Sequence, residues 1–515
     1  MSLPELMRQR REKLAVWRAD GDDPYAYRFE VTAHAAELLA RGDQVTTEPG
    51  ERVRVAGRVM TLRGHGKAGF AHLLDGTGSI QIYFRADQLD ERFRRYQRLD
   101  VGDWIGVAGP LFRTKTGEIT IRAEDLELLA KALRPLPEKW HGLRDTETRF
   151  RQRYADLFMN LEVREIFRRR ARLISGMREF LEARDYLEVE TPVLQPLYGG
   201  AFAQPFVTHH NALDLDLYLR ISNELYLKRL IVGGFERVFE FSRDFRNEGM
   251  DRTHSPEFTM LEFYQAFADV HDMMALTEAL VVHAVECATG STTLVYQGQP
   301  LDFTPPWPRV SLLDAVSDKV GERVHALDAA QLGRLAARHQ LEFQPGSGAG
   351  ALLDELFSAL VQPELVRPTF VVDHPREISP LARAKRDQPD VVERFEIVAA
   401  GMELANAFSE QNDPEAQARA FEDQQQRREA GELETQVTDR DYLRALEYGM
   451  PPTGGVGIGI DRMAMLVCDA RSIRDVILFP PLRPEEGRPA EEEEEEVAAD
   501  PEGEERATAE GMPPR

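Results

Sequence analysis

The apolar and polar residues follow two different patterns along the chain. In the first quarter, short runs of alternating apolar and polar residues predict five strands. A helical stretch from about 87 to 98 separates the third strand from the fourth, which is the element order of a small OB-type barrel. A further helix is expected over 4–18, ahead of the barrel. The predicted strands are 52–62, 70–75, 79–84, 103–112 and 119–130.

From about residue 161 the pattern changes to apolar strands mixed with amphipathic helices, which indicates an α+β domain. The domain opens with a helix over about 162–184, and the strand that follows is interrupted by Pro192, as at an edge or an interface. Prolines and then charges fill the segment before it, as in a linker. The expected parts are an N-terminal helical extension (1–50), the barrel (51–132), the linker (133–160), the α+β domain (161–484) and an acidic tail (485–515).

The charge of the chain is unevenly distributed. The formal net charge is −24, and residues 485–515 hold 13 acidic and 3 basic residues, a net of −10, which leaves −14 for the rest. Net charge is therefore a poor guide to nucleic-acid binding by the body of the chain. The tail cannot bury enough apolar surface to offset its chain entropy, so we expect it to be disordered. The helix over 4–18 is basic on its surface, as a solvated face or as a contact to RNA phosphates; its basic residues are Arg8, Arg10, Arg11 and Lys13.

Cysteine usage and hydropathy limit the compartment. Cys287 and Cys468 stand far apart and outside any CxxC motif, which argues against a disulfide framework and against a cysteine zinc site. The chain has no apolar run near 18 residues, and its N-terminus lacks the apolar core of a secretory signal. We therefore expect no membrane span and a cytoplasmic location.

Residues 235–264 place dense charge between two apolar runs, which predict the two strands of a hairpin. Charges packed between buried strands need partners, because an unpaired buried charge is costly. The tip is either a solvated loop whose ions pair with each other, or a binding site for a polyphosphate with an attached base. A ring and hydrogen-bonding groups at short intervals favour the second interpretation; they are His254, Phe258, Glu262 and Tyr264.

Further polar groups stand in apolar surroundings later in the chain. The glycines at 199–200 allow the backbone to approach a ligand closely, and Glu224 stands at an expected helix start. Residues 394–410 alternate like a strand and yet contain acids. Glu396 and Glu403 are seven residues apart, so simple alternation places them on opposite faces unless Gly401 introduces a bulge.

A glycine-rich run at 451–459 leads into a helix that carries Arg462. Such a run reflects either close packing or phosphate binding, and an arginine at the head of the helix favours phosphate. Together with Arg246 it would offer two guanidinium groups to a triphosphate, while Glu396 and Glu403 could hold Mg²⁺.

Three barrel residues fall where a splayed base could be stacked and hydrogen-bonded, as OB barrels commonly do. Phe70 lies on the second strand, Gln81 on the third, and Glu118 beside the turn between the last two strands. Each of the three is otherwise an ordinary packing or surface residue.

These motifs together resemble the class II aminoacyl-tRNA synthetases. Three stretches resemble the signature motifs of that class: FRNEG with H-x-PEFT-x-LE-x-Y (245–264), EVETP (188–192) and GIGIDR (457–462). Longer matches over residues 1 to about 484 are similar to the bacterial lysyl-tRNA synthetases. They include GGAFAQPFVTHHN (199–211), ELYLKRLIVGGFERVFE (224–240), FSEQNDP (408–414) and SIRDVILFP (472–480).

The resemblance implies an OB barrel joined to a catalytic domain with an antiparallel sheet flanked by helices. It implies a ligase that activates lysine with ATP and passes it to the 3′ end of tRNA(Lys). The implied ATP contacts are Arg246, Glu248, His254, Phe258 and Arg462, with Arg246 and Arg462 catalytic. The implied lysine contacts are Gly200, Glu224, Arg246, Glu262, Tyr264, Asn406, Phe408 and Glu410, and the implied Mg²⁺ ligands are Glu396 and Glu403.

The resemblance also implies partners. The barrel would read the anticodon of the tRNA, and two copies of the chain would pair through the motif that contains Pro192. The implied anticodon contacts are Arg58, Phe70, Gln81 and Glu118.

Three other interpretations compete. An aspartate or asparagine enzyme of the same class conflicts with acids at 262 and 410, and a non-catalytic relative conflicts with the arginines at 246 and 462. A lysine ligase that acts on a protein conflicts with the intact barrel. The chain departs from the lysine family at Gln411, where leucine is usual, and at Asn223, where proline is usual. Neither departure changes a charged contact, and the acidic tail lies outside the family pattern.

Overall fold

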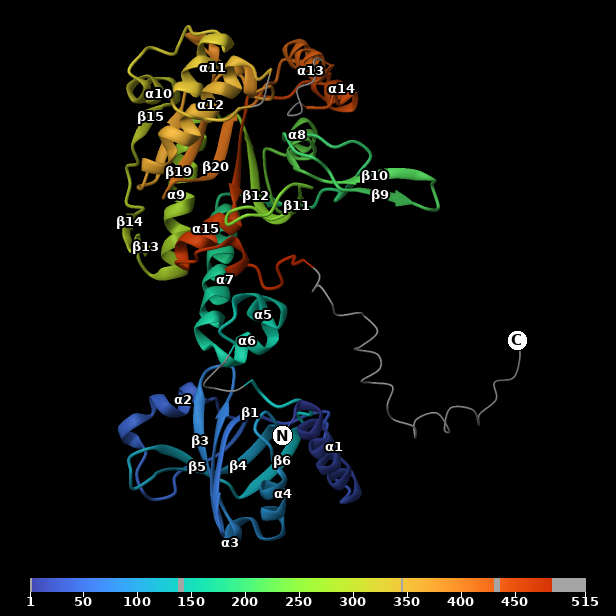
Figure 1. Ribbon diagram of the computed structural model, residues 1–515, viewed down its shortest axis with the longest axis vertical. Helices are drawn as coiled ribbons and strands as arrows, with labels where there is room; N and C mark the ends of the chain where they lie inside the picture. The colour runs from blue at the N-terminus through green and yellow to red at the C-terminus, as the bar shows by residue number, and fades with distance from the viewer. Residues whose placement is uncertain (1, 138–142, 344–345, 430–435, 484–515) are drawn as a thin grey trace, which may run out of the picture. The chain divides into compact units, whose positions relative to one another are not determined.

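The computed structural model describes residues 2–137, 143–343, 346–429 and 436–483 (Figure 1). The chain divides into two compact units, Met1–Asp145 and Thr146–Arg515. The predicted acidic tail, 485–515, lies outside the described residues. Among the described helices, none combines the length and the apolar character needed to cross a membrane.

The first unit is a closed barrel whose sheet runs in the order β1-β2-β3-β5-β4-β6, with β1 also paired to β4. On β3 the alternate residues Ile80, Ile82 and Phe84 point into the core, as the period of two predicts. The stretch expected as one strand at 119–130 is two strands, because the chain leaves one end of β4 and rejoins it at the other. The strands are β1 (Arg52–His65), β2 (Ala68–Leu74), β3 (Ser79–Arg85), β4 (Trp104–Arg113), β5 (Ile119–Arg122) and β6 (Asp125–Ala130).

In the described part of this unit, the barrel is accompanied by the α-helices α1 (Leu3–Ala19), α2 (Ala35–Ala40), α3 (Ala86–Leu89) and α4 (Phe93–Arg98). The expected position on the surface of α1 is wrong for one of the four basic residues, Arg10. Arg10 is buried and donates to the carbonyls of Val101, Ala132 and Arg134. Lys13 pairs with Asp100 at 2.6 Å. These groups attach α1 to the barrel, so they are not free for RNA phosphates.

The second unit is built on an eight-stranded sheet in the order β15-β16-β19-β20-β21-β12-β11-β7. Its centre is antiparallel, and only the edge pairs β7–β11 and β15–β16 are parallel. Alternation assigns the two faces: on β12, Leu261 and Phe263 enter the core, while Glu262 and Tyr264 face the opposite side. The strands are β7 (Leu187–Glu188), β11 (Arg237–Phe245), β12 (Glu257–Ala266), β15 (Arg309–Ser311), β16 (Thr369–Val372), β19 (Arg394–Ala399), β20 (Met402–Ser409) and β21 (Thr453–Gly459).

Helices cover both faces of this sheet (Figure 1). The core on one face joins α7 (Leu161–Glu182), α9 (Val270–Thr289) and α15 (Ile460–Val467) to the central strands. The other face carries α8 (Glu224–Val232), α13 (Pro414–Glu429) and α14 (Arg440–Glu447). A third cluster holds α10 (Leu312–Val320), α11 (Ala329–Arg338) and α12 (Ala349–Leu360) against the sheet edge.

The remaining strands form small sheets. They are β8 (Leu194–Gln195), β9 (Val207–His210) and β10 (Leu215–Leu219), the pair β13 (Thr293–Tyr296) and β14 (Gln299–Asp302), and the pair β17 (Ala384–Lys385) and β18 (Gln388–Val392). The β9–β10 hairpin extends away from the body of the unit (Figure 1). Within the segment expected as a linker, 133–160, residues 146–159 form α5 (Thr146–Arg151) and α6 (Arg153–Met159). Arg153 on α6 is buried and donates to the carbonyls of Arg474, Ile477 and Leu478, which anchors this part in the second unit.

Candidate active site

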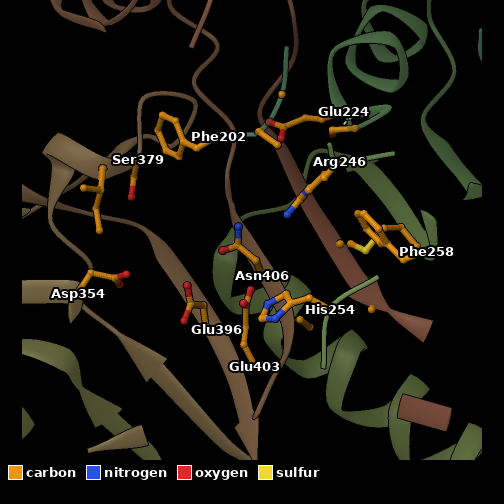
Figure 2. A pocket seen from close by; sticks show the side chains of 18 of the residues that line it. Phe202, Glu224, Arg246, His254, Phe258, Asp354, Ser379, Glu396, Glu403 and Asn406 are labelled. Carbon is orange, nitrogen blue, oxygen red and sulfur yellow. Dashed lines mark hydrogen bonds between the residues drawn. The ribbon is translucent and has the colours of Figure 1, made fainter. Parts of the chain in front are cut away.

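All fourteen residues of the second unit that the sequence predicts as ligand contacts line one cavity of about 1210 Å³. They come from distant parts of the chain: the 199–202 loop, α8, the β11–β12 hairpin, β19, β20 and α15. Figure 2 shows that the guanidinium of Arg246 points toward Asn406, with His254 and Glu403 below them. The predicted residues on the cavity wall are Gly200, Glu224, Arg246, Glu248, His254, Phe258, Glu262, Tyr264, Glu396, Glu403, Asn406, Phe408, Glu410 and Arg462.

The β11–β12 hairpin has the predicted form, with Phe239 opposite Phe263 and Phe245 opposite Glu257. At its tip, the guanidinium carbon of Arg246 lies 5.0 Å from the ring centroid of Phe258. Its Nε is buried without a hydrogen-bond partner in the described structure. A partly buried guanidinium in this state favours an anionic ligand.

Arg462 and His254 meet across the cavity wall. Arg462 Nη2 lies 2.9 Å from His254 Nε2, and Arg462 Nη1 donates to the Glu403 carbonyl at 2.8 Å. His254 Nδ1 lies 2.7 Å from the carboxylate of Asp251. Although burial opposes it, hydrogen bonds from Thr253 and His254 lower the pKa of Asp251 to about 2. The hairpin tip and the head of α15 therefore form one polar wall.

The predicted metal ligands lie on one face, because a bulge interrupts the alternation, at Leu404 and not at Gly401. Residues 394–410 form two strands joined by a turn at Ala400 and Gly401, both with positive φ, and not one continuous strand. The register shifts so that Glu396 pairs with Asn406 but Val398 pairs with Glu403, leaving Leu404 as the extra residue. This bulge turns Glu403 to the face of Glu396.

The two carboxylates suit a divalent cation. Burial, together with the charges of Glu403 and Asp354, raises the pKa of Glu396 to about 8 against the opposing charge of Arg394. A cation would relieve this repulsion, and Mg²⁺ commonly binds through one or two carboxylates while sharing substrate phosphates. The described residues contain no group of three or more acids, histidines or cysteines placed to hold a metal by themselves. The pair therefore fits a metal that arrives with a phosphate ligand.

A cluster of buried acids forms the other end of the cavity. The exposed fractions are 7% for Glu224, 5% for Glu262 and 2% for Glu410. Tyr264 donates to Glu262 at 2.9 Å and Ser222 donates to it at 3.2 Å. Burial, reinforced by the charges of Asp244 and Glu224, raises the pKa of Glu262 well above its ordinary value. Carboxyl groups that are buried close to other negative charges favour a cationic ligand.

Glycines of the 451–459 run make room for these acids, so close packing accounts for Gly454 and Gly455, while Gly457 and Gly459 line the cavity together with Arg462. Most of the run is β21, a central strand, and Gly455 lies directly over the acid cluster. A side chain there would overlap Glu410 and Tyr264, and one at Gly454 would overlap Met273. Gly200 has a φ of +88° and lies against Ser222 and Glu224.

Arg394, which no sequence pattern singled out, orients three groups of the wall. It donates to Asn406 Oδ1 at 2.8 Å, to Ser379 at 2.9 Å and to Glu396 at 2.6 Å. Because its Nε–H bonds the amide oxygen of Asn406, the amide nitrogen is left to donate to a ligand. The signal was a charged residue at the start of an apolar strand, two residues before Glu396.

The face of the barrel brings three of its four predicted residues together. Gln81 Nε2 donates to Glu118 Oε2 at 2.6 Å, and the ring of Phe70 stacks on Tyr83 at 4.7 Å between centroids. His72, which the sequence analysis missed, lies 3.1 Å from Glu118 Oε1. The face thus combines stacked rings with a hydrogen-bonding network, the two elements that bind single-stranded bases.

Arg58 lies apart from this network. Its guanidinium donates to the Gly102 carbonyl at 3.1 Å and lies 5.0 Å from the ring centroid of Trp104. Exposed Arg63 lies directly opposite Phe70 in the register of β1 and β2 and is the better-placed cation. Several arginines stand along this strand, at positions 52, 54, 58 and 63, so the sequence alone did not distinguish them.

The site lies on an antiparallel sheet and combines two arginines, a pair of carboxylates and a pocket of buried acids beside glycines. This combination is that of a class II synthetase. The model of tRNA synthetases class II (D, K and N) matches residues 145–483, and the chain belongs to this family. A model of the OB-fold nucleic acid binding domain matches residues 53–129. These matches confirm the predicted fold class.

Within the family, the chain is similar to lysine–tRNA ligases. It is 52% identical to that of Pelotomaculum thermopropionicum, over 94% of this chain and 96% of the relative. It is 51% identical to that of Moorella thermoacetica, over 94% and 98%. It is 54% identical to that of Roseiflexus castenholzii, over 94% and 100%. The resemblance to lysyl-tRNA synthetases is thereby confirmed.

Proposed function

We propose that this chain activates L-lysine with ATP, forming lysyl-adenylate and pyrophosphate, and transfers lysine to the 3′ end of tRNA(Lys). The observation that carries the proposal is the composition of the cavity. One end presents three buried carboxylates, and the other presents two arginines beside a ring that can stack on a base. An amino acid with two ammonium groups and a nucleoside triphosphate match these two ends.

In the first half-reaction a carboxylate attacks the α-phosphorus, so two anions must approach each other. The guanidinium of Arg246, beside Phe258, would bind the lysine carboxylate and the α-phosphate together. Arg462 would bind the outer phosphates, with His254 and Glu248 in the same ATP loop and Phe258 against adenine. Mg²⁺, when bound at Glu396 and Glu403, would neutralise phosphate charge. No side-chain nucleophile is needed.

Selectivity for lysine follows from the acids. Glu224 and Gly200 would take the α-amino group, and Glu262, Tyr264, Asn406, Phe408 and Glu410 would surround the side chain. A neutral isostere would leave buried acids unpaired, a loss that reaches roughly 10⁴- to 10⁵-fold in discrimination. Aspartate, a substrate type named in the family description, would meet like charges there.

In the second half-reaction the terminal ribose of tRNA attacks the adenylate. We propose that the face formed by Phe70, Gln81 and Glu118 binds the anticodon, with Arg63, and not Arg58, as the neighbouring cation. Stacked rings and an amide–carboxylate pair on a barrel of this topology support it. The cytoplasm, where charged tRNA is consumed, is the proposed location.

We further propose a homodimer through the segment around Pro192. Exposed apolar side chains gather beside it, including Leu187 at 47%, Leu194 at 46% and Val207 at 61%. Monomers rarely expose such groups together, so a second copy of this segment is the proposed cover. Sedimentation velocity would test it, and a monomer at micromolar concentration would exclude it.

The function is tested by ATP–pyrophosphate exchange with a panel of lysine, ornithine, aspartate and asparagine, followed by aminoacylation of purified tRNA. Lysine should give the strongest exchange, and charging should require tRNA(Lys). Arg246→Gln, as a catalytic control, should abolish both reactions. Stronger exchange with aspartate or asparagine would refute the assignment of the acids.

A further inference from the structure

A lysine side chain of the protein itself lies behind the acid pocket. Lys228 is on α8, four residues after Glu224, and its side chain has no exposed surface. Its Nζ pairs with both Glu224 and Glu410 and lies 5.2 Å from the ring centroid of Phe408. Glu224, Glu410 and Phe408 line the cavity, and Lys228 does not. Its ammonium therefore contacts the acids from behind and does not face a ligand.

The charges of this group do not cancel. With all groups ionised, Glu224, Glu262 and Glu410 carry minus three and Lys228 carries plus one, a net of minus two. Arg394, which also acts on Glu224, is paired with Glu396 at 2.6 Å. One lysine molecule brings two ammonium groups, and its carboxylate would bind Arg246. One substrate therefore neutralises the pocket.

The surroundings keep Lys228 charged. Burial by itself would lower the pKa of Lys228, but the charges of Glu224 and Glu410 outweigh it and raise that pKa. Burial raises the pKa of Glu410 well above its ordinary value, even though Lys228 opposes the shift. The other titratable or charged groups that act on this set are Tyr442, Tyr264, Glu262, Asp244, Arg229 and Arg394.

We propose that Lys228 is a positioning residue that sets the charge and spacing of the lysine pocket. It neutralises one of the three acids and holds Glu224 apart from Glu410, so that each presents an oxygen to one ammonium group of the substrate. Glu410 Oε1, which is buried without a hydrogen-bond partner in the described structure, is the acceptor left for the ε-ammonium. The inference rests on the proposed assignment of these acids to lysine.

Removing the charge of Lys228 changes the number of protons that the pocket binds. Without Lys228 the three acids lose their counter-charge, so one more of them binds a proton, and lysine must displace that proton when it binds. The slope of log KM for lysine against pH equals minus the number of protons displaced. KM therefore falls with rising pH, and in Lys228→Met it falls more steeply, by up to about one further decade per pH unit. A side chain that only fills space would leave the slope unchanged.

The test compares Lys228→Met with Lys228→Arg, which keeps the charge, in ATP–pyrophosphate exchange over roughly pH 6 to 9. We expect Lys228→Met to raise KM for lysine at least roughly tenfold at neutral pH and to steepen its slope, with KM for ATP within about twofold. Lys228→Arg should keep the slope of the unmodified protein. An unchanged slope in folded Lys228→Met overturns the proposal.

If Lys228→Met does not fold, the double variant Lys228→Met with Glu224→Gln decides, because it removes one charge of each sign. Recovery of folding by the double variant, monitored by circular dichroism, together with a normal slope in Lys228→Arg supports the proposal. If the double variant or Lys228→Arg fails to fold, the shape of the lysine side chain and not its charge is what the fold requires. That outcome overturns the proposal. Glu410→Gln distinguishes failure of the role proposed for Lys228 from failure of the proposed function. An unchanged KM for lysine in that variant refutes the assignment of the acids to the lysine pocket.

Discussion

Replacing Glu410 by glutamine removes a charge from the end of the cavity while keeping the shape of the side chain. Glu410 is 2% exposed, and its Oε1 has no hydrogen-bond partner in the described structure, so a bound ε-ammonium would supply one. A hydrogen bond between charged groups contributes about 1.5 to 3 kcal/mol. At 1.4 kcal/mol per factor of ten, Glu410→Gln should raise KM for lysine about 10- to 150-fold.

The assay is ATP–pyrophosphate exchange, with lysine and ATP varied in turn. KM for ATP should change by less than about twofold, because the ATP contacts lie at the other end of the cavity. Glu393→Gln is the matched control: Glu393 is also buried, at 8% exposed, and accepts from Ser409 at 2.7 Å, but it does not line the cavity. Its KM for lysine should stay near normal. Equal rises in both KM values for Glu410→Gln would refute the pocket assignment.

Three further predictions follow from the geometry. Phe70→Ala should lower kcat/KM for tRNA in aminoacylation roughly 5- to 150-fold, the range of one stacked base, and leave lysine-dependent exchange near normal; loss of exchange would contradict the barrel's role. Gly455→Ala should weaken lysine binding, because the added methyl overlaps Glu410 and Tyr264; calorimetric titration with lysine checks this, and unchanged affinity would contradict it. Glu403→Gln should raise the Mg²⁺ concentration for half-maximal exchange at least roughly tenfold; an unchanged Mg²⁺ titration would exclude Glu403 as a ligand.

Local pattern was sufficient for much of the fold. The alternation in 235–264 predicted the β11–β12 hairpin, and the strand order predicted the OB barrel. These features depend on the period of two along a strand and on turn residues, which are readable within about ten residues. The site residues were found by resemblance to a family, and the cavity then brought together the fourteen in the second unit.

Contacts between distant segments decided the rest. Alternation placed Glu396 and Glu403 on opposite faces, but pairing with β20 produced a bulge that reversed one of them. The sequence indicated a solvated Arg10, but this side chain is buried against the barrel, where three carbonyls accept its hydrogen bonds.

The sequence by itself determined most of the strands and helices, and which side chains share a face along an uninterrupted strand. Only the tertiary structure decided which partner each charged side chain contacts. Lys228 shows the difference: its spacing from Glu224 is visible in the sequence, yet Glu410, far along the chain, is what completes its buried ion pairs. Burial of a charge is stable only when the folded chain supplies its partners, and those partners come from segments whose proximity local sequence does not encode.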